Sequence, residues 1–227
     1  MLKVGLIQPN FQTGPKHLNS FYLPYTVGLL WSYVKQSPTI SENYQLYDML
    51  FRRDNVYEAV EHYKHCDVVI VSFYIWSSKY CFRFCDLLKK ANPDIKILAG
   101  GPDLDWRDKE FFNKYPYIDF IVVGEGEIAC EKILEDITNG TATKRIYQEP
   151  RMKDLDIPSP YIAGIFDELM ANHTDIEWIP TLETDRGCPY ACTFCDWGSA
   201  TASKMFQIYF ERIETELEWF ADHKLPF

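Results

Sequence analysis

Three of the seven cysteines lie within eight residues of one another, and their type and spacing could support metal chemistry. Cys188, Cys192 and Cys195 form the pattern C-x3-C-x2-C. Thiolates are soft ligands that select iron–sulfur clusters, zinc or copper(I). A structural zinc site needs four protein ligands, and the nearest further candidates, His173 and Asp196, are not at the usual paired spacing. Three close thiolates can instead hold three irons of a cubane and leave the fourth iron open for a substrate.

The elements that must position this loop are a strand before it and a helix after it. Ile176–Glu183 has the pattern of a strand, and Phe206–Asp222 has that of a helix. The apolar face of this helix consists of Phe206, Phe210, Ile213, Leu217 and Phe220. Gly187, Pro189 and Gly198 flank the cysteines and make a packed-core role for the thiols a poor fit. Zinc stays an alternative on spacing alone.

Residues 1–139 alternate strand and helix patterns. The predicted strands are Lys3–Gln8, Tyr44–Leu50, Asp67–Ile75, Ile95–Ala99 and Ile118–Val123. The predicted helices are Tyr25–Lys35, Asn55–His65, Ser77–Lys90, Asp108–Tyr115 and one that contains Ala129 and stops at Asn139-Gly140. Units of this length predict an α/β fold with a doubly wound, parallel, Rossmann-like sheet.

Ligands of such sheets bind at the carboxyl ends of the strands. The residues there are Gln8-Pro9-Asn10, Ser72–Trp76, Gly100-Gly101-Pro102 and Gly124-Glu125-Gly126-Glu127. Two of these four loops are rich in glycine, as close backbone approach to a bulky ligand requires. Either acid of the last loop can also be explained by the dipole at a helix N-terminus, and for Glu127 this explanation is at least as good.

The rest of the chain changes character. Residues 140–175 contain Pro150, Pro158 and Pro160 in a polar stretch, which predicts an ordered linker. Residues 176–227 then supply one strand–loop–helix unit. With 227 residues, the chain has room for about one and a half domains of ordinary size.

Composition and charge exclude several functional classes. The net charge of −10 disfavours nucleic acid and anionic membranes as partners. The sequence has no apolar run of membrane-spanning length and no signal-peptide pattern. An odd number of cysteines, seven, argues for reduced thiols. We therefore expect a cytoplasmic protein.

The segment RGCPYACTFC resembles the cluster-binding loop of the radical S-adenosylmethionine (SAM) superfamily, which has an aromatic residue before its last cysteine. The resemblance implies that Cys188, Cys192 and Cys195 bind a 4Fe-4S cluster whose open iron chelates SAM. It also implies that Phe194 packs near the adenine. A reductant such as flavodoxin or ferredoxin is the implied partner, with a small molecule or a peptide as substrate.

The order of the whole chain is similar to that of cobalamin-binding radical SAM enzymes. These place a doubly wound domain, here residues 1–139, before a linker and the cluster loop. By that resemblance, residues 176–227 begin a radical SAM barrel and the chain is an N-terminal fragment. The implied reaction is methyl transfer to an unactivated carbon, or rearrangement at one. The residues implied to line a groove for cobalamin are Ser72, Gly100, Gly101, Pro102, Gly124, Glu125 and Gly126.

One departure concerns the lower ligand of cobalt. Cobalamin domains of the methionine-synthase type carry Asp-x-His-x-x-Gly after the first strand, and the stretch PNFQTGPKHLN lacks this motif. We therefore expect no protein histidine on cobalt, and His17 is a poor candidate because surface-loop histidines are common.

Three alternatives stay open. One is a radical SAM enzyme without cobalamin, whose first domain serves only to bind substrate, and a test for retained corrin would decide it. Methylthiotransferases hold a second cluster in their first domain, but Cys66, Cys81, Cys85 and Cys130 are predicted to be core thiols. A non-enzymatic alternative is a cobalamin- or nucleotide-binding module with a structural metal site. Iron and sulfide in near-equal amounts would favour the enzyme, and stoichiometric zinc would favour the module.

Overall fold

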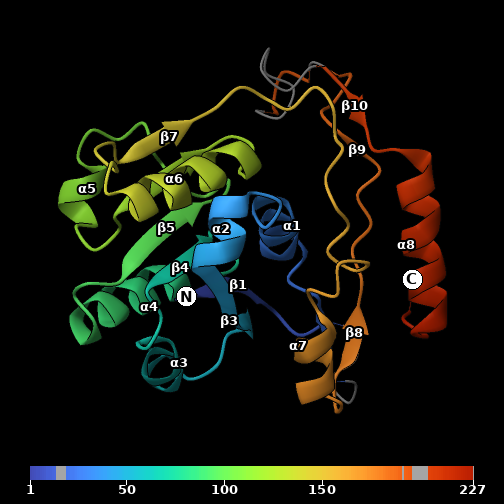
Figure 1. Ribbon diagram of the computed structural model, residues 1–227, viewed down its shortest axis with the longest axis horizontal. Coiled ribbons are helices and arrows are strands. Elements are labelled where there is room, and N and C mark those ends of the chain that lie inside the picture. Colours follow the sequence, from blue (N-terminus) through green and yellow to red (C-terminus); the bar gives the residue numbers. More distant parts are fainter. Residues whose placement is uncertain (14–18, 191, 196–203, 227) are drawn as a thin grey trace.

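The computed structural model describes residues 1–13, 19–190, 192–195 and 204–226. Within these residues, six parallel strands form the main sheet (Figure 1). Their spatial order is β3 (Tyr44–Arg52), β1 (Leu2–Asn10), β4 (Val68–Ser72), β5 (Lys96–Gly100), β6 (Phe120–Val123) and β7 (Ile146–Gln148). The predicted α/β class with a parallel sheet is confirmed.

Helices cover both faces of the sheet. One apolar core lies beneath α1 (Tyr25–Val34), α2 (Pro38–Asn43) and α6 (Glu127–Asn139). The other lies beneath α3 (Val56–Tyr63), α4 (Ser78–Ala91) and α5 (Phe111–Lys114). β4 shows why the sequence is so apolar here, since its alternate residues enter opposite cores: Val68 and Ile70 face one, Val69 and Val71 the other.

The sheet and the first helical layer contain elements that the sequence patterns did not predict. β7 lies within the predicted linker and extends the sheet past residue 139, and α2 fills the connection between α1 and β3. The predicted strand Asp67–Ile75 was too long, because β4 ends at Ser72. The Tyr74 carbonyl accepts hydrogen bonds from the amides of Ser77 and Ser78, both at 2.8 Å, and this turn leads into α4.

The remaining described elements lie beside the main sheet. β2 (Ser20–Tyr22) pairs in parallel with β8 (Glu177–Ile179), and β9 (Asp185–Arg186) pairs antiparallel with β10 (Phe206–Gln207). The predicted strand Ile176–Glu183 is shorter in the structure because Pro180 follows β8 and has no amide hydrogen for a ladder. The predicted helix Phe206–Asp222 begins later, as α8 (Phe210–Asp222), because Phe206 is paired in β10.

The segment between β7 and β8 contains α7 (Asp167–Asn172) and packs against both α1 and α8. Its side chain Tyr161 is buried, stacks on Tyr25 of α1 at 5.9 Å between ring centroids, and contacts Phe220 of α8 at 4.8 Å. Gly28 of α1 lies so close to Phe166 that a Cβ would be 2.4 Å from the ring. The predicted linker is therefore packed into the core.

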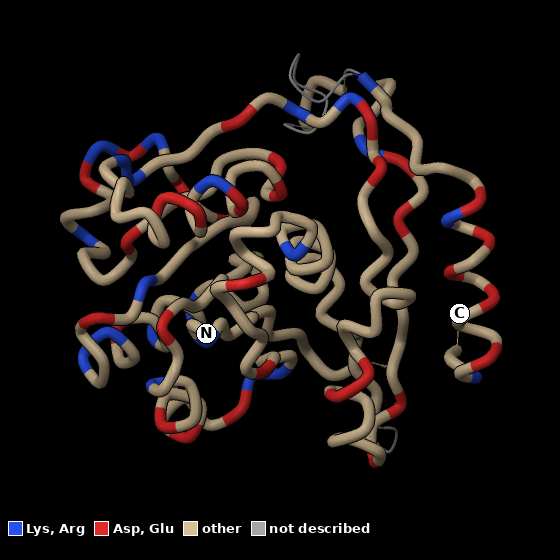
Figure 2. The backbone as a smooth tube through the Cα atoms, viewed as in Figure 1, with Lys and Arg blue, Asp and Glu red and all other residues tan. Residues whose placement is uncertain are grey.

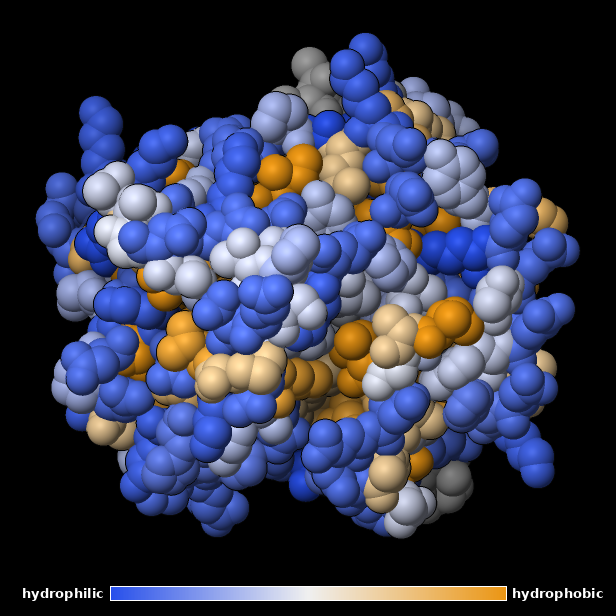
Figure 3. Space-filling model, in the orientation of Figure 1, coloured by the Kyte–Doolittle hydropathy of each residue, from blue (hydrophilic) through white to orange (hydrophobic). Residues whose placement is uncertain are grey.

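The surface is strongly polar around this core. Figure 2 shows acidic residues along the whole length of α8, and Figure 3 shows separate apolar patches bordered by hydrophilic residues on the face displayed. No helix of the described part of the chain is both long enough and apolar enough to cross a membrane.

Candidate functional site

The carboxyl edge of the main sheet brings together the predicted groove residues of β4 and β5. Ser72 and Gly100 are paired in register at the ends of these strands, and Ser72 is buried. Near the end of β1, Gln8 is buried and accepts a hydrogen bond from the amide of Val27 at 3.1 Å. This bond fixes the start of α1 at the same edge.

The two glycine-rich loops at this edge have different local structures. Gly101 has a φ of 115°, and a Cβ there would lie 2.3 Å from the Phe73 carbonyl oxygen. Gly124 has a φ of 83°, yet a Cβ there would meet nothing within 4 Å. At Gly126, a Cβ would lie 2.8 Å from Cδ2 of Leu30. Gly124 therefore leaves open space at the edge, while Gly101 and Gly126 allow tight packing of the protein itself.

Exposed apolar side chains also gather at this edge. The sequence placed Ser72–Trp76 here but assigned no role to its apolar residues after Ser72. Trp76 stacks on Tyr74 at 4.6 Å and contacts Phe11 edge-on at 6.1 Å. Ile75, in the same loop, is 79% exposed. Exposed apolar residues at the carboxyl edge of a parallel sheet fit a large, flat, partly apolar ligand such as a corrin ring. Their signal in the sequence was the apolar run that continues past the end of β4.

The acidic residues of the loop between β6 and α6 face the protein rather than open space. The Glu125 carboxylate accepts hydrogen bonds from Nε of Arg151 at 2.8 Å and from the Met152 amide at 2.9 Å. Glu127 is buried in the first turn of α6 and accepts a hydrogen bond from Nη2 of Arg186 at 2.6 Å. The helix-dipole explanation of Glu127 is thus accompanied by an ion pair that sequence reasoning missed.

Arg186, two residues before Cys188, is the centre of this charged group. Its Nε donates to Oε1 of Glu183 at 2.8 Å, and its Nη1 lies 3.8 Å from Oε2 of Glu125. Burial lowers the pKa of Arg186, but Glu183 and Glu127 more than offset this and raise it above its usual value. Nothing in the sequence spacing connects Arg186 with residues some 60 positions earlier.

The three clustered cysteines are accessible. Cys188 is half-buried, Cys192 and Cys195 are exposed, and the Cys195 amide donates to the Cys192 carbonyl at 3.2 Å. Phe194 is 91% exposed. In the described residues, no group of three or more metal-ligating side chains is gathered closely enough to hold an ion. Three accessible thiols on one loop suit an iron–sulfur cluster chemically, and the ligand assignment stays a prediction.

The other four cysteines have a different environment, as the sequence analysis expected. Cys66, Cys81, Cys85 and Cys130 are all buried in the cores. Burial raises the pKa of Cys66, Cys81 and Cys130 to about 12 and that of Cys85 well above its usual value. These neutral, enclosed thiols are poor metal ligands. His17 and Asp196 lie outside the described residues.

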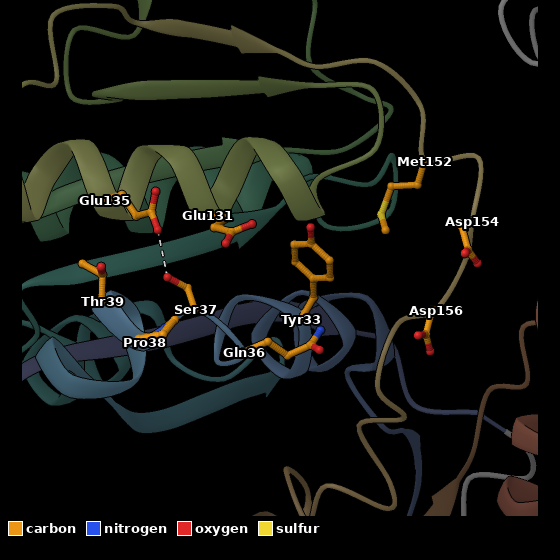
Figure 4. Close-up of a pocket in the computed structure, with 10 residues that line it drawn as sticks. All are labelled: Tyr33, Gln36, Ser37, Pro38, Thr39, Glu131, Glu135, Met152, Asp154 and Asp156. Atoms are coloured by element: carbon orange, nitrogen blue, oxygen red, sulfur yellow. Dashed lines mark hydrogen bonds between the residues drawn. The ribbon is translucent and has the colours of Figure 1, made fainter.

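A cavity of about 590 Å³ lies between the end of α1, α6 and the 152–156 segment. Figure 4 shows Glu131 and Glu135 of α6 opposite Tyr33 and Ser37, with Met152, Asp154 and Asp156 at the right of the view. Oγ of Ser37 donates to Oε1 of Glu135 at 2.8 Å. Its full lining is Tyr33, Gln36, Ser37, Pro38, Thr39, Glu131, Glu135, Met152, Asp154 and Asp156. None of the predicted cofactor residues lines it.

Comparison with known proteins shows the family of the chain. Residues 31–134 match the B12 binding domain family. A cobalamin-dependent radical SAM methyltransferase, TokK, from Streptomyces tokunonensis is 35% identical over 225 residues, which cover 91% of this chain and 33% of that protein. The chain belongs to the cobalamin-binding radical SAM family.

Other relatives extend the comparison. The 2-(S-pantetheinyl)-carbapenam-3-carboxylate methyltransferase of Streptantibioticus cattleyicolor is 34% identical over 220 residues, covering 89% of this chain and 32% of that protein. The anaerobic magnesium-protoporphyrin IX monomethyl ester cyclase of Rubrivivax gelatinosus is 24% identical over 217 residues. These cover 86% of this chain and 38% of that protein. The chain thus spans about a third of the length of these curated relatives.

Proposed function

We propose that this cobalamin-binding radical SAM family member serves methyl transfer to an unactivated carbon. The observation that carries the proposal is the similarity, over about nine tenths of the chain, to two methyltransferases, one of them named as cobalamin-dependent. The match includes both the sheet with its B12 binding region and the segment with the cysteine loop. Residues 176–227 would then contribute the beginning of a radical SAM barrel.

Two sets of residues in this chain would bind the two cofactors. Ser72, Gly100, Gly101 and Gly124 would shape the edge against which a corrin lies, with Ile75 and Trp76 excluding water from it. Cys188, Cys192 and Cys195 would hold a 4Fe-4S cluster, and Phe194 would pack against the adenine of SAM. When bound, the cluster supplies the electron that cleaves SAM, and cobalamin supplies the methyl group. The protein's part is to bind and orient these groups and keep them from water.

The partners follow from the same proposal. A low-potential reductant such as flavodoxin or ferredoxin would deliver the electron, and the methyl acceptor would be a small molecule or a peptide. The net charge of −10 supports a partner other than nucleic acid.

Metal and corrin analysis tests the proposal. After anaerobic reconstitution with iron, sulfide and hydroxocobalamin, we expect near-equal iron and sulfide and a retained corrin spectrum. Cys192→Ala should lose the iron, whereas the matched control Cys130→Ala, which removes a buried thiol, should keep it. His17→Ala should leave the spectrum of bound cobalamin unchanged. Stoichiometric zinc in place of iron, or the absence of a retained corrin, would contradict the proposal.

A further inference from the structure

The cysteine loop begins and ends on a short strand pair. β9 leads into the loop and β10 follows it, with Arg186 opposite Phe206 and Asp185 opposite Gln207. The two stems of the loop are therefore held side by side. Both stems are also attached to the loop between β6 and α6, which borders the open edge of the sheet.

The entering stem is attached through Arg186. Its side chain is only 12% exposed and meets three carboxylates at once: Glu127 at 2.6 Å, Glu183 at 2.8 Å and Glu125 at 3.8 Å. A planar guanidinium with five donors can satisfy such a set, and an ammonium cannot match its geometry. The other oxygen of Glu127, Oε2, has no hydrogen-bond partner among the described residues. Its buried charge is therefore compensated mainly by Arg186.

The leaving stem is attached through Arg151. Nε of Arg151 donates to Oε1 of Glu125 at 2.8 Å, and its Nη1 donates to the Lys204 carbonyl at 2.9 Å. Its guanidinium also lies 5.0 Å from the centre of the Phe206 ring. Glu125 therefore reaches both stems, one through Arg186 and the other through Arg151.

We propose that Arg186 and Arg151 are positioning residues that clamp the two stems of the cysteine loop to Glu125 and Glu127. The clamp holds the two stems, and with them the start of the loop at Cys188, in one arrangement relative to the corrin edge. Its role for two cofactors rests on the proposed function, but the clamp itself is a property of this chain alone.

Thiol labelling of the cluster-free protein tests the clamp. Under reducing conditions, Arg186→Met should raise the iodoacetamide labelling rate of half-buried Cys188 by about fivefold or more, because its stem can open locally. The four buried cysteines should stay protected and thus report that the fold is intact. The matched control is Lys89→Met, which breaks the half-buried ion pair with Asp119 at 2.9 Å and should leave Cys188 unchanged. An unchanged Cys188 rate in Arg186→Met, or a rise shared with the buried cysteines, would overturn the proposal.

Two further variants keep the test decisive if Arg186→Met does not fold. The double variant Glu125→Gln/Glu127→Gln removes two charges without changing side-chain shape and leaves Arg186 its partner Glu183. This double variant should also raise the iodoacetamide labelling rate of Cys188. Arg186→Lys should give an intermediate rate, and a rate equal to that of the unaltered chain would count against the multi-carboxylate clamp.

The reconstituted protein provides a readout of positioning. Pulsed electron paramagnetic resonance between the reduced cluster and cob(II)alamin should give a broader distance distribution in Arg186→Met at equal iron and corrin content. An unchanged distribution would contradict the positioning role. If the unaltered chain bound no iron or corrin, the proposed function would fail, while the labelling experiment would still decide the clamp.

Discussion

Gly101 and Gly124 both adopt a positive φ at the ligand edge of the sheet, but they face different neighbours. At Gly101 the space for a side chain is filled by the backbone of Phe73, whose amide donates to the Gly100 carbonyl at 2.7 Å. At Gly124 no atom lies within 4 Å of that position. Gly101 thus serves the fold, and Gly124 leaves room for something outside it.

Alanine substitutions separate the two roles. We expect Gly101→Ala to lower the free energy of unfolding by about 3 kcal/mol, since strain at positive φ adds to a backbone clash. Gly124→Ala should cost only about 1 kcal/mol, from the positive φ alone. Urea denaturation of the two variants measures the difference. Equal losses would show that the clash at Gly101 relaxes without cost.

Sequence reasoning at the level of residues located these glycines but not their partners. The glycine runs and the C-x3-C-x2-C spacing are local patterns, so they could be recognised directly. The pairing of Arg186 with Glu125 and Glu127 joins residues from separate elements, and only the fold brings them together. For the same reason Glu125 was expected in the groove, whereas its carboxylate bonds to Arg151 and Met152.

Among the elements, Tyr161 shows how the segment after β7 is held. Its hydroxyl donates to the Thr181 carbonyl at 2.8 Å and accepts from the Thr181 amide at 2.9 Å. The ring is buried between α1 and α8. One side chain therefore connects this segment, the first helical layer and the stretch that follows β8.

Removing that hydroxyl should destabilise the protein measurably. Tyr161→Phe would leave both backbone groups of Thr181 without a partner and cost about 1–3 kcal/mol. The matched control Tyr57→Phe removes the hydroxyl of an exposed side chain, whose one described hydrogen bond is a 3.3 Å surface contact with Arg83, and should change stability by less than about 0.5 kcal/mol. Thermal and urea unfolding of both variants measure the cost. A loss no larger than that of the control would mean that water replaces the missing bonds.

Long, periodic elements were predicted well, and short ones were not. The near-continuous apolar run that contains β4 and the helical spacing of α4 are patterns within one segment. The run reflects the burial of both faces of the sheet. β2 and β7 have three residues each, too few for a period, and both are defined by partners elsewhere in the chain. Part of the predicted linker is therefore β7, the edge strand of the sheet.

At the scale of the whole molecule, the buried thiols should lower the free energy of unfolding at alkaline pH. Burial raises the pKa of Cys66, Cys81 and Cys130 to about 12 in the folded chain, whereas an unfolded thiol has a pKa of about 8.5. The unfolded state therefore loses these protons first. The stabilisation is complete below about pH 8.5 and is lost as pH rises towards about 12.

The expected result is a steady fall in the free energy of unfolding above about pH 8.5, with each such thiol contributing up to about 1.4 kcal/mol per pH unit. Cys130→Ala should make this fall less steep. The control Cys192→Ala removes an exposed thiol in place of a buried one. Urea titrations at several pH values measure the slopes, and equal slopes in the two variants would rule out burial as the cause.

The parallel pair of β2 and β8 has a consequence for synthesis of the chain. Ser20 pairs with Glu177, and their side chains form a hydrogen bond at 2.6 Å across 157 positions of sequence. At about 5–20 residues per second, a ribosome needs roughly 10–30 s to make the intervening stretch. During that interval β2 has no strand to pair with, although β1, beside it in sequence, can already join β3 and β4. The small sheet is therefore a late step of folding, completed only after the six-stranded sheet has left the ribosome.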